Sequence, residues 1–296
     1  MSRKDLRGAA NHFAGKWSAR RSAKRKYRQR TLLIADHWDG SVQQFYHFML
    51  GYLFPLASWI SSHPNKPIMV RDCGPMNVWF NALREGIDIE IVPPGGALHL
   101  VIGNRIDHVI LQGLDDPHRF NRHKLLTGAA ALVELLGPSQ EPASSHTSRT
   151  CHQVIVIDRQ SNETFYHSDA SETHMSGSER RSTPNVKGVI WESLTDLDVR
   201  TIDFADVPPQ EQIATMRESS VLVGQHGAGL LHMVWMKPGS SVIEIEPPLP
   251  KEVKGLFAQL AQCLGHRYVS IKQENVHSDI DATELVRAIH QMAEGS

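Results

Sequence analysis

The sequence predicts an α/β protein with two Rossmann-like lobes, each built on a parallel sheet, and a cleft between them. From residue 31 onward, short aliphatic runs typical of strands alternate with longer helix-like runs, the pattern of parallel strands joined by crossover helices. A polar stretch rich in serine and proline, SQEPASSHTSR, interrupts this alternation, which then starts again. Two such runs separated by a linker predict two lobes that face each other.

The same composition changes set the domain boundaries that we expect. A basic segment precedes the first predicted strand, and an amphipathic helix follows the last one. The predicted units are a flexible basic arm over 1–30, a first lobe over 31–138, a linker over 139–150, a second lobe over 151–275 and a C-terminal helix over 276–296.

In the first lobe, the continuous apolar run TLLIA predicts a buried strand over Thr31–Ala35. The apolar stretch Gln43–Ile60 predicts a long helix with a break near Pro55, because proline removes a helical hydrogen bond. Pro75 marks the start of one later helix, and Gly137-Pro138 marks the end of another. Strands are predicted over 67–70, 87–92 and 107–111, and helices over 75–85 and 122–136.

In the second lobe, QVIVI predicts the first strand, and the polar stretch Gln160–Lys187 has little periodicity and predicts a long loop. The stripe of apolar residues within Lys251–Leu264 predicts an amphipathic helix that ends at Gly265. The remaining predicted strands are 199–204, 221–224, 241–246 and 268–271, and the remaining predicted helices are 209–219 and 282–292.

The charge distribution is uneven along the chain. Residues 2–30 contain eleven lysines and arginines and one acidic residue, Asp5, although the whole chain has a formal net charge of −1. Such an arm favours an anionic partner, for which we expect a membrane surface rather than nucleic acid; the alternative is a solvated leader. Because we find no apolar run of about 18 residues and no secretory signal, we expect a cytoplasmic protein, peripheral at the membrane.

Cysteine and histidine spacing gives no sign of a metal site. The three cysteines are scattered without a CxxC pair, HExxH does not occur, and Asp115-Asp116 matches half of a DxD. We therefore expect no metal and no cofactor.

The stretch VLVGQHGAGLLHMVWMKPGSSVIEI contains the strongest candidate site. It predicts a strand, a glycine turn, a helix starting near Gly229 and a second strand. Gly227 and Gly229 leave the backbone open to a ligand, and amides at a helix start attract phosphate. His226 adds a donor there, and Glu244 is expected at the rim, where it can accept from ribose hydroxyls. The alternative is a tight turn that only lets helix and strand pack closely.

The same stretch resembles the HGAGL signature of glycosyltransferase family 61. The strand-following Arg159, the RRSTPN segment and the Glu-Gln pair before the HGAG strand are also similar to the family pattern. The resemblance implies a GT-B-like fold, with a second lobe that binds a nucleotide sugar and a first lobe that binds the acceptor. The donor site that it predicts, together with the glycine turn, comprises Arg159, Arg181, Asn185, Gln212, Gly224, His226, Gly227, Ala228, Gly229, Leu230 and Glu244.

Candidate catalytic residues follow the first strand, in DHWDGSVQQFYHF. Asp36, Asp39 and His47 are expected at its carboxyl end, facing the cleft. His47 is the preferred general base, with an aspartate as the candidate that orients it, and Asp39 is the next candidate; a histidine packed under the helix is the alternative. FYHF resembles the YHF motif of the family, which usually has Asp or Glu four residues after the histidine, where this chain has Gly51.

The resemblance implies an inverting transfer of a sugar from a nucleotide-sugar donor to a glycan or lipid-linked saccharide acceptor, by analogy in the synthesis of a surface polysaccharide. An α/β-hydrolase, in which HG begins an oxyanion loop, is disfavoured because no GxSxG elbow occurs. Because of Gly51, a pseudo-glycosyltransferase that binds nucleotide or glycan without turnover stays open as an alternative.

Overall fold

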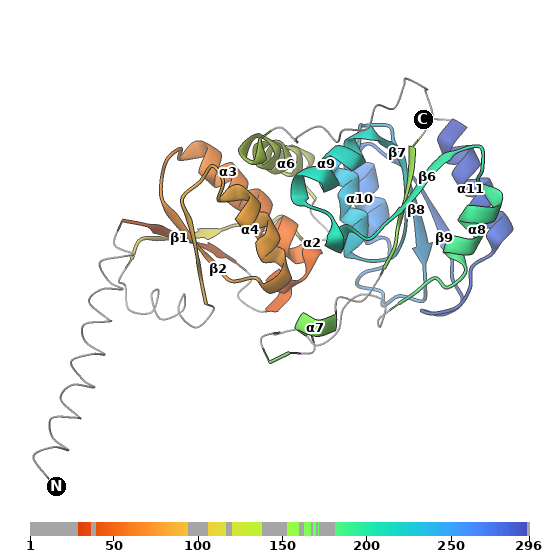
Figure 1. Ribbon diagram of the computed structural model, residues 1–296, viewed down its shortest axis with the longest axis horizontal. Coiled ribbons are helices and arrows are strands. Elements are labelled where there is room, and N and C mark those ends of the chain that lie inside the picture. The colour runs from red at the N-terminus through yellow and green to blue at the C-terminus, as the bar shows by residue number, and fades with distance from the viewer. Residues whose placement is uncertain are drawn as a thin grey trace, which may run out of the picture.

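The computed structural model describes residues 29–36, 40–93, 106–116, 120–137, 153–159, 163–166, 168–169, 171 and 181–294. These residues form two parallel sheets, with helices between the sheets and on the far side of the second one (Figure 1). The α/β class with two Rossmann-like lobes is confirmed. Asp39, the predicted linker over 139–150 and all but the last two residues of the predicted arm lie outside the described residues.

The first sheet has the strand order β3-β2-β1-β4, and all neighbouring strands are parallel. Its strands are β1 (Thr31–Ala35), β2 (Ile68–Arg71), β3 (Ile89–Val92) and β4 (His108–Leu111). The helical segments of this lobe are η1 (Gly40–Gln43), α2 (Phe45–Phe48), η2 (Met49–Leu53), α3 (Phe54–Ser62), η3 (Gly74–Met76), α4 (Asn77–Leu83) and α6 (Arg122–Leu136).

The second sheet has the order β6-β5-β7-β8-β9 and is also parallel throughout. Its strands are β5 (Gln153–Ile157), β6 (Asp198–Ile202), β7 (Ser219–Gln225), β8 (Ser241–Glu246) and β9 (Arg267–Lys272). Its helical segments are α7 (Glu163–Tyr166), α8 (Val186–Ser193), η5 (Phe204–Asp206), α9 (Pro209–Glu218), η6 (Ala228–Trp235), α10 (Leu256–Leu264) and α11 (Ala282–Glu294).

Every predicted strand is found within two residues of its expected bounds, but four helical predictions are wrong. The predicted loop over 160–187 contains α7 and the start of α8, a helix that the sequence analysis missed. The helix predicted from Lys251 begins only at Leu256, because Gly255 has a left-handed backbone with φ of 76°. The third correction concerns the helix predicted near Gly229, which is the 3₁₀ segment η6.

The long helical run that starts at Phe45 is not broken at Pro55. Pro55 lies in the first turn of α3, and the irregularity precedes it as the π-helix η2, which contains Gly51. A proline ring clashes with the carbonyl four residues earlier, here that of Gly51. The wider π-turn accommodates the ring without ending the helix, and π-turns are frequent at functional sites.

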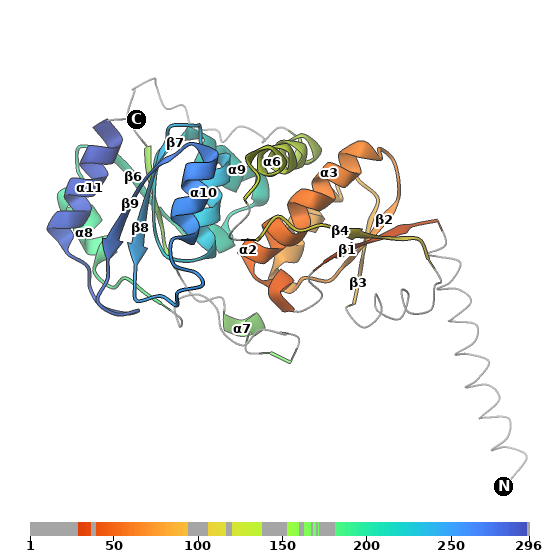
Figure 2. The same cartoon turned by 180° about the vertical axis from the view of Figure 1, so that it is seen from behind.

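The two lobes share one hydrophobic core along the faces that the sheets turn toward each other (Figures 1 and 2). Rings from the two lobes meet there: Phe54 lies edge-to-face on Trp235 with centroids 5.5 Å apart, and Phe45 stacks on His232 at 4.7 Å. On the far side of the second sheet, α8 and α11 cover a separate apolar cluster, so the helix predicted as a C-terminal unit packs on this sheet. The shared core therefore fixes the position of the strand ends of one sheet relative to those of the other.

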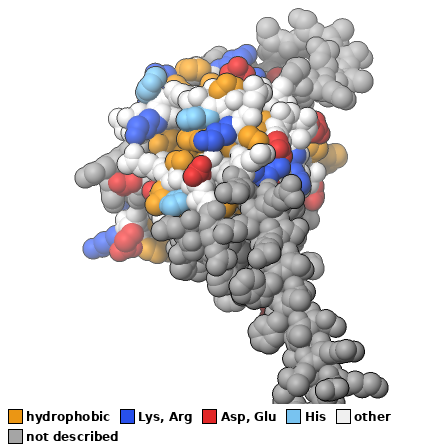
Figure 3. All heavy atoms as spheres, turned by 90° about the vertical axis from the view of Figure 1, so that its left-hand side faces the viewer, with side chains coloured by type: hydrophobic (Ala, Val, Ile, Leu, Met, Phe, Trp, Pro, Cys, Tyr) orange, Lys and Arg blue, Asp and Glu red, His pale blue; other side chains and the backbone are white. Residues whose placement is uncertain are grey.

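The described surface of the first lobe intermixes side chains of both charge signs with apolar and uncharged polar ones, as the end-on view shows (Figure 3). None of the helices in the described part of the chain combines the length and hydropathy that crossing a bilayer requires.

His232 is the polar residue at the centre of the shared core. Its ring is sandwiched between Phe45 and Phe204, with centroids 4.7 and 3.9 Å away. Nδ1 lies 2.8 Å from the carbonyl oxygen of Gly229, and Nε2 lies 2.9 Å from Oε1 of Gln212. Burial lowers the pKa of His232 to about 4, so the ring is neutral at pH 7 and donates to only one of these two acceptors.

This burial predicts how stability depends on pH. The unfolded chain protonates His232 below about pH 6.5, whereas the folded chain does so only near pH 4, so the free energy of unfolding falls as pH decreases through this window. His232 should contribute up to about 1.4 kcal/mol per pH unit to the slope of the free energy of unfolding against pH. We expect His232→Gln to remove this contribution, which urea unfolding between pH 7 and 4 measures. A wild-type stability that rises relative to the variant on acidification would show instead that the folded ring is an imidazolium donating to both acceptors.

Candidate functional site

The strand orders locate two ligand-binding edges. In an open parallel sheet, ligands bind beyond the carboxyl ends of the strands, where the strand order reverses direction. The order β3-β2-β1-β4 reverses between β1 and β4, and the order β6-β5-β7-β8-β9 reverses between β5 and β7. The predicted catalytic segment follows β1, while Arg159 and the HGAG loop follow β5 and β7, so all three lie at these reversal points.

In the first lobe, the reversal point brings the loop after β4 against the segment after β1. Oδ2 of Asp36 accepts a hydrogen bond from the backbone N–H of Gly113 at 3.0 Å. The next residue, Leu114, donates its N–H to the carbonyl of Leu50 in the π-helix at 2.8 Å. Asp36 therefore holds the loop that carries Asp115, rather than standing free in the cleft.

Asp115 is the partner of His47. Nδ1 of His47 lies 2.8 Å from Oδ2 of Asp115; the histidine side chain is 39% exposed, whereas that of the aspartate is only 4% exposed. Because the carboxylate accepts the proton on Nδ1, Nε2 is the ring nitrogen that can take up a proton. The orienting aspartate, which the sequence analysis left unnamed, thus comes from the loop after β4. The Asp115-Asp116 pair after a strand was the available signal.

The Asp115 carboxylate also lies close to the position of Gly51. A Cβ atom on Gly113 would lie 2.8 Å from Oδ1 of Asp115, 2.9 Å from Oδ1 of Asp36 and 3.3 Å from Cα of Gly51. Gly113 therefore has no room for a side chain. Two carboxylates and the glycine of the π-helix surround one small volume beside His47.

In the second lobe, the glycine turn leads into a 3₁₀ segment instead of the α-helix that was expected. Gly227 has φ of 156° and ψ of 176°, a backbone region that essentially only glycine occupies. The N–H groups of His226 and Leu230 donate to the carbonyls of Ile245 and Gly227, so these two amides are used within the fold. This turn consequently lacks the α-helix whose dipole was expected to attract phosphate.

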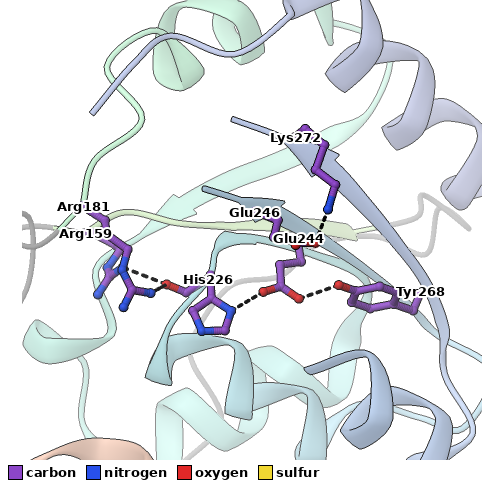
Figure 4. Close-up of polar contacts among 7 residues, drawn as sticks. All are labelled: Arg159, Arg181, His226, Glu244, Glu246, Tyr268 and Lys272. Atoms are coloured by element: carbon purple, nitrogen blue, oxygen red, sulfur yellow. Dashed lines mark hydrogen bonds and ion pairs between the residues drawn. The ribbon is translucent and has the colours of Figure 1, made fainter. Parts of the chain in front are cut away.

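Two arginines from separate segments converge on this loop (Figure 4). Nη1 of Arg159 and Nη1 of Arg181 both donate to the carbonyl oxygen of His226, at 3.1 and 2.6 Å. A Cβ atom on Gly227 would lie only 3.0 Å from Nη1 of Arg159, so the missing side chain leaves space for the guanidinium. Two positive groups held this close together favour a bound anion between them.

His226 belongs to a buried relay that includes Glu244 and Tyr268 (Figure 4). Nδ1 of His226 contacts Oε1 of Glu244, and the hydroxyl of Tyr268 donates to Oε2 of the same carboxylate at 2.5 Å. Burial, the Glu244 charge and this hydrogen bond raise the pKa of Tyr268, which stays protonated. The relay orients the ring so that Nε2 is the atom available to a ligand.

The position expected for Glu244, at the rim beside a ribose, is wrong. Glu244 is buried in β8, and each of its carboxylate oxygens is engaged within the protein. Glu246, two residues farther along the strand, is the acidic residue near the strand end, and it pairs with Lys272 at 2.6 Å (Figure 4).

Arg181 is held in place by residues that the sequence analysis did not single out. Nε2 of Gln225, at the end of β7, donates to the carbonyl of Ser182 at 3.0 Å and to Oε1 of Gln273 at 2.6 Å. Gln273 in turn donates to the same Ser182 carbonyl at 2.8 Å. These contacts tie the Arg181 segment to the ends of β7 and β9, and no local sequence signal marks them.

The structure places the other predicted donor-site residues in supporting positions. The Gln212 amide donates to the carbonyls of Phe204 and Val207 and lies against His232 in the shared core. The Asn185 amide pairs with both backbone groups of Ile280 and anchors the segment before α11. These contacts favour structural roles for both residues.

The remaining members of the loop pack closely on β5. A Cβ atom on Gly224 or on Gly229 would lie 2.9 or 3.1 Å from Cδ1 of Ile157, and Leu230 is buried. For these positions the close-packing explanation of the glycines therefore holds, whereas at Gly227 the neighbour is Arg159. Ala228, at the start of η6, also packs against the shared core.

A chain of aromatic rings connects the two halves of the site. His47 lies edge-to-face on Tyr46 with centroids 5.2 Å apart, and Tyr46 lies edge-to-face on Phe257 of the second lobe at 6.2 Å. Phe257 then contacts the ring of His226 at 5.1 Å. The exposed histidine of the first lobe and the arginine-flanked histidine of the second are thus brought to one region between the lobes.

Within the described residues, no group of three or more histidine, cysteine or acidic side chains has the geometry to hold a metal ion.

Comparisons with known proteins identify the family of the chain. The family model described as Glycosyltransferase 61 matches residues 45–243, which is about two thirds of the chain. The matched range includes His47 and His226. A search of curated proteins finds no match. Among solved structures, the chain is similar to "Crystal Structure Analysis of the Glycotransferase of kitacinnamycin" with 11% identity and a TM-score of 0.28, over 86% of this chain and 76% of the other.

The close approach of Arg159 to Gly227 predicts a specific effect of adding one methyl group. We expect Gly227→Ala to displace the guanidinium and strain the backbone, and so to weaken anion binding at least tenfold in a folded protein, measured by calorimetric titration with pyrophosphate. Gly188→Ala is the matched control, because a Cβ atom there meets nothing within 4 Å and lies in a helix. Equal pyrophosphate affinity of the two variants would refute an anion site at this turn.

Proposed function

The chain belongs to glycosyltransferase family 61, and we propose that it transfers a sugar from a nucleotide-sugar donor to a saccharide acceptor with inversion at the anomeric carbon. One observation carries the proposal. His47 with its buried Asp115, and the HGAG loop with its two arginines, lie at the reversal points of two parallel sheets and meet between the lobes. An acceptor-activating base and an anion site are the two groups that such a transfer needs.

In the proposed reaction, Nε2 of His47 removes the proton from the acceptor hydroxyl. The resulting oxygen nucleophile bonds to the anomeric carbon as the bond between that carbon and the diphosphate oxygen breaks. The leaving oxygen takes the bonding electron pair, and the product is a nucleoside diphosphate. Asp115 keeps the proton on Nδ1 and offsets the positive charge that the ring gains.

The diphosphate charge is proposed to bind to Arg159, Arg181 and His226. Guanidinium groups form short charge-assisted hydrogen bonds to phosphate, and the contact of Nδ1 of His226 with Glu244 leaves Nε2 of that ring for the ligand. Because side chains of the protein supply this positive charge, we propose that the transfer needs neither a divalent metal nor another cofactor.

The acceptor is proposed to be a glycan or a lipid-linked saccharide, as in the synthesis of a surface polysaccharide. The basic residues of the arm over 2–30 suit contact with an anionic membrane surface from the cytoplasmic side. Binding of a nucleotide sugar without turnover would instead support the inactive, ligand-binding alternative that Gly51 suggested.

The His47–Asp115 pair predicts a kinetic signature. We expect His47→Ala to lower turnover by about 10²–10⁴-fold, and Asp115→Asn to lower it less, while the affinity for the nucleotide-sugar donor stays within about twofold. The measurements are steady-state kinetics and donor titration, with His63→Ala as a control because His63 is an exposed histidine at the end of α3. Near-normal turnover of His47→Ala would move the general base to Asp36 or Asp39.

Metal removal provides a second test. If Arg159, Arg181 and His226 neutralise the charge of the diphosphate, the reaction needs no bound cation. Turnover in about 5 mM EDTA should then stay within about twofold of turnover in the presence of Mg²⁺. Loss of turnover that added Mg²⁺ or Mn²⁺ restores would contradict this account of the leaving group.

A further inference from the structure

Tyr46 has a buried hydroxyl without a partner. The residue is 8% exposed, and among the described residues nothing forms a hydrogen bond with its Oη atom. A buried polar group that is left unpaired is costly, and native proteins contain few of them. An unpaired hydroxyl at this position can be explained if it forms a hydrogen bond with a bound ligand.

The other described tyrosines show that this is unusual in the same chain. The hydroxyl of Tyr52 donates to the carbonyl of Leu33 at 2.6 Å, and that of Tyr166 donates to the carbonyl of Gln43 at 2.9 Å. Tyr268 donates to Glu244 at 2.5 Å. Tyr46 alone among these four tyrosines makes no hydrogen bond through its hydroxyl.

The position of Tyr46 indicates which ligand group it can reach. Its ring lies between His47, the proposed base of the first lobe, and Phe257, which contacts His226 of the second lobe. In the proposed reaction, the transferred sugar has to lie between the base that activates the acceptor and the groups that hold the diphosphate. In that arrangement Tyr46 would lie beside the sugar rather than beside the nucleoside.

The hydroxyl is suited to donate. Burial first, and then the nearby charges of Asp115 and Asp116, raise the pKa of Tyr46, so the proton stays on the oxygen throughout the neutral pH range. A neutral donor beside two carboxylates matches a neutral sugar oxygen better than a phosphate, for which the arginines are available. Residues of two different lobes cover the ring, and the adjoining His47 side chain is 39% exposed, so Tyr46 lies next to a surface that a ligand can reach.

We propose that the Tyr46 hydroxyl donates a hydrogen bond to an oxygen of the transferred sugar and so helps the enzyme to distinguish a nucleotide sugar from the free nucleoside diphosphate. This assignment rests on the proposed function, because it needs a nucleotide-sugar donor. Tyr46 is a binding residue in this scheme, and the proton transfer remains with His47.

The test uses the full chain and the conservative variant Tyr46→Phe. A thermal-shift panel of UDP, GDP and CMP sugars identifies the donor of the wild type, and the dissociation constants of that nucleotide sugar and of its free nucleotide are then measured calorimetrically. We expect Tyr46→Phe to bind the free nucleotide as the wild type does, and to bind the nucleotide sugar about three- to tenfold more weakly. In the absence of ligand, its Tm should be equal to or higher than that of the wild type, because the variant lacks an unpaired buried group.

Tyr52→Phe is the matched control. It removes the same atom six residues farther along the chain, but there the hydroxyl is hydrogen-bonded, so Tm should fall while the ratio of the two dissociation constants stays unchanged. Unchanged nucleotide-sugar affinity in Tyr46→Phe would overturn the assignment and indicate a trapped water as the partner; a lower Tm would indicate a structural partner and overturn it as well. Failure of every nucleotide sugar to bind the wild type would refute the proposed function itself.

Discussion

The apolar contact between the two lobes is the constraint on which the candidate site depends. The segments that carry His47 and His226 belong to different sheets, and the rings of Tyr46 and Phe257 are what connects them. Farther along the same interface, Phe54 on Trp235 extends the contact. Closely packed interiors transmit small shifts, so this interface determines the distance between the proposed base and the anion site. It also explains why a neutral, buried His232 is tolerated there, because flanking rings and nearby acceptors replace its contacts with water.

The same arrangement occurs in both lobes, with different exposure. In each case a buried carboxylate contacts Nδ1 of a histidine, which leaves Nε2 for a ligand: Asp115 with His47, and Glu244 with His226. The His47 side chain is substantially exposed and can exchange a proton with a substrate, whereas His226 is buried between Phe257 and the relay and has a fixed orientation. An unpaired buried charge is strongly destabilising, so the carboxylates of Asp115 and Glu244 can be buried only because each one is hydrogen-bonded.

Gly51 and Asp115 give a structural account of how this chain departs from the family pattern. The π-helix around Gly51 accommodates Pro55 and lets the backbone of the β4 loop approach, as the hydrogen bond from Leu114 to Leu50 shows. Position 51 lacks a carboxylate, but the Asp115 carboxylate comes near it: a Cβ atom on Gly113 would lie 2.8 Å from Oδ1 of Asp115 and 3.3 Å from Cα of Gly51.

The sequence by itself determined the two-lobed α/β class, the strands to within two residues, and the two loops at which a site could form. Aliphatic runs and glycine turns act locally, through backbone geometry and hydrogen-bond periodicity, so they can be recognised without knowing distant neighbours. The tertiary structure alone decided which acidic residue serves each histidine, because Asp115 is 68 residues from His47, and Tyr268 is 24 residues from the Glu244 that it supports. It also decided that η6 is a 3₁₀ segment, that Gln212 and Asn185 support the fold, and that the Tyr46 hydroxyl lacks a partner. These properties depend on which side chains meet when the two sheets pack, and no local spacing in the chain encodes that meeting.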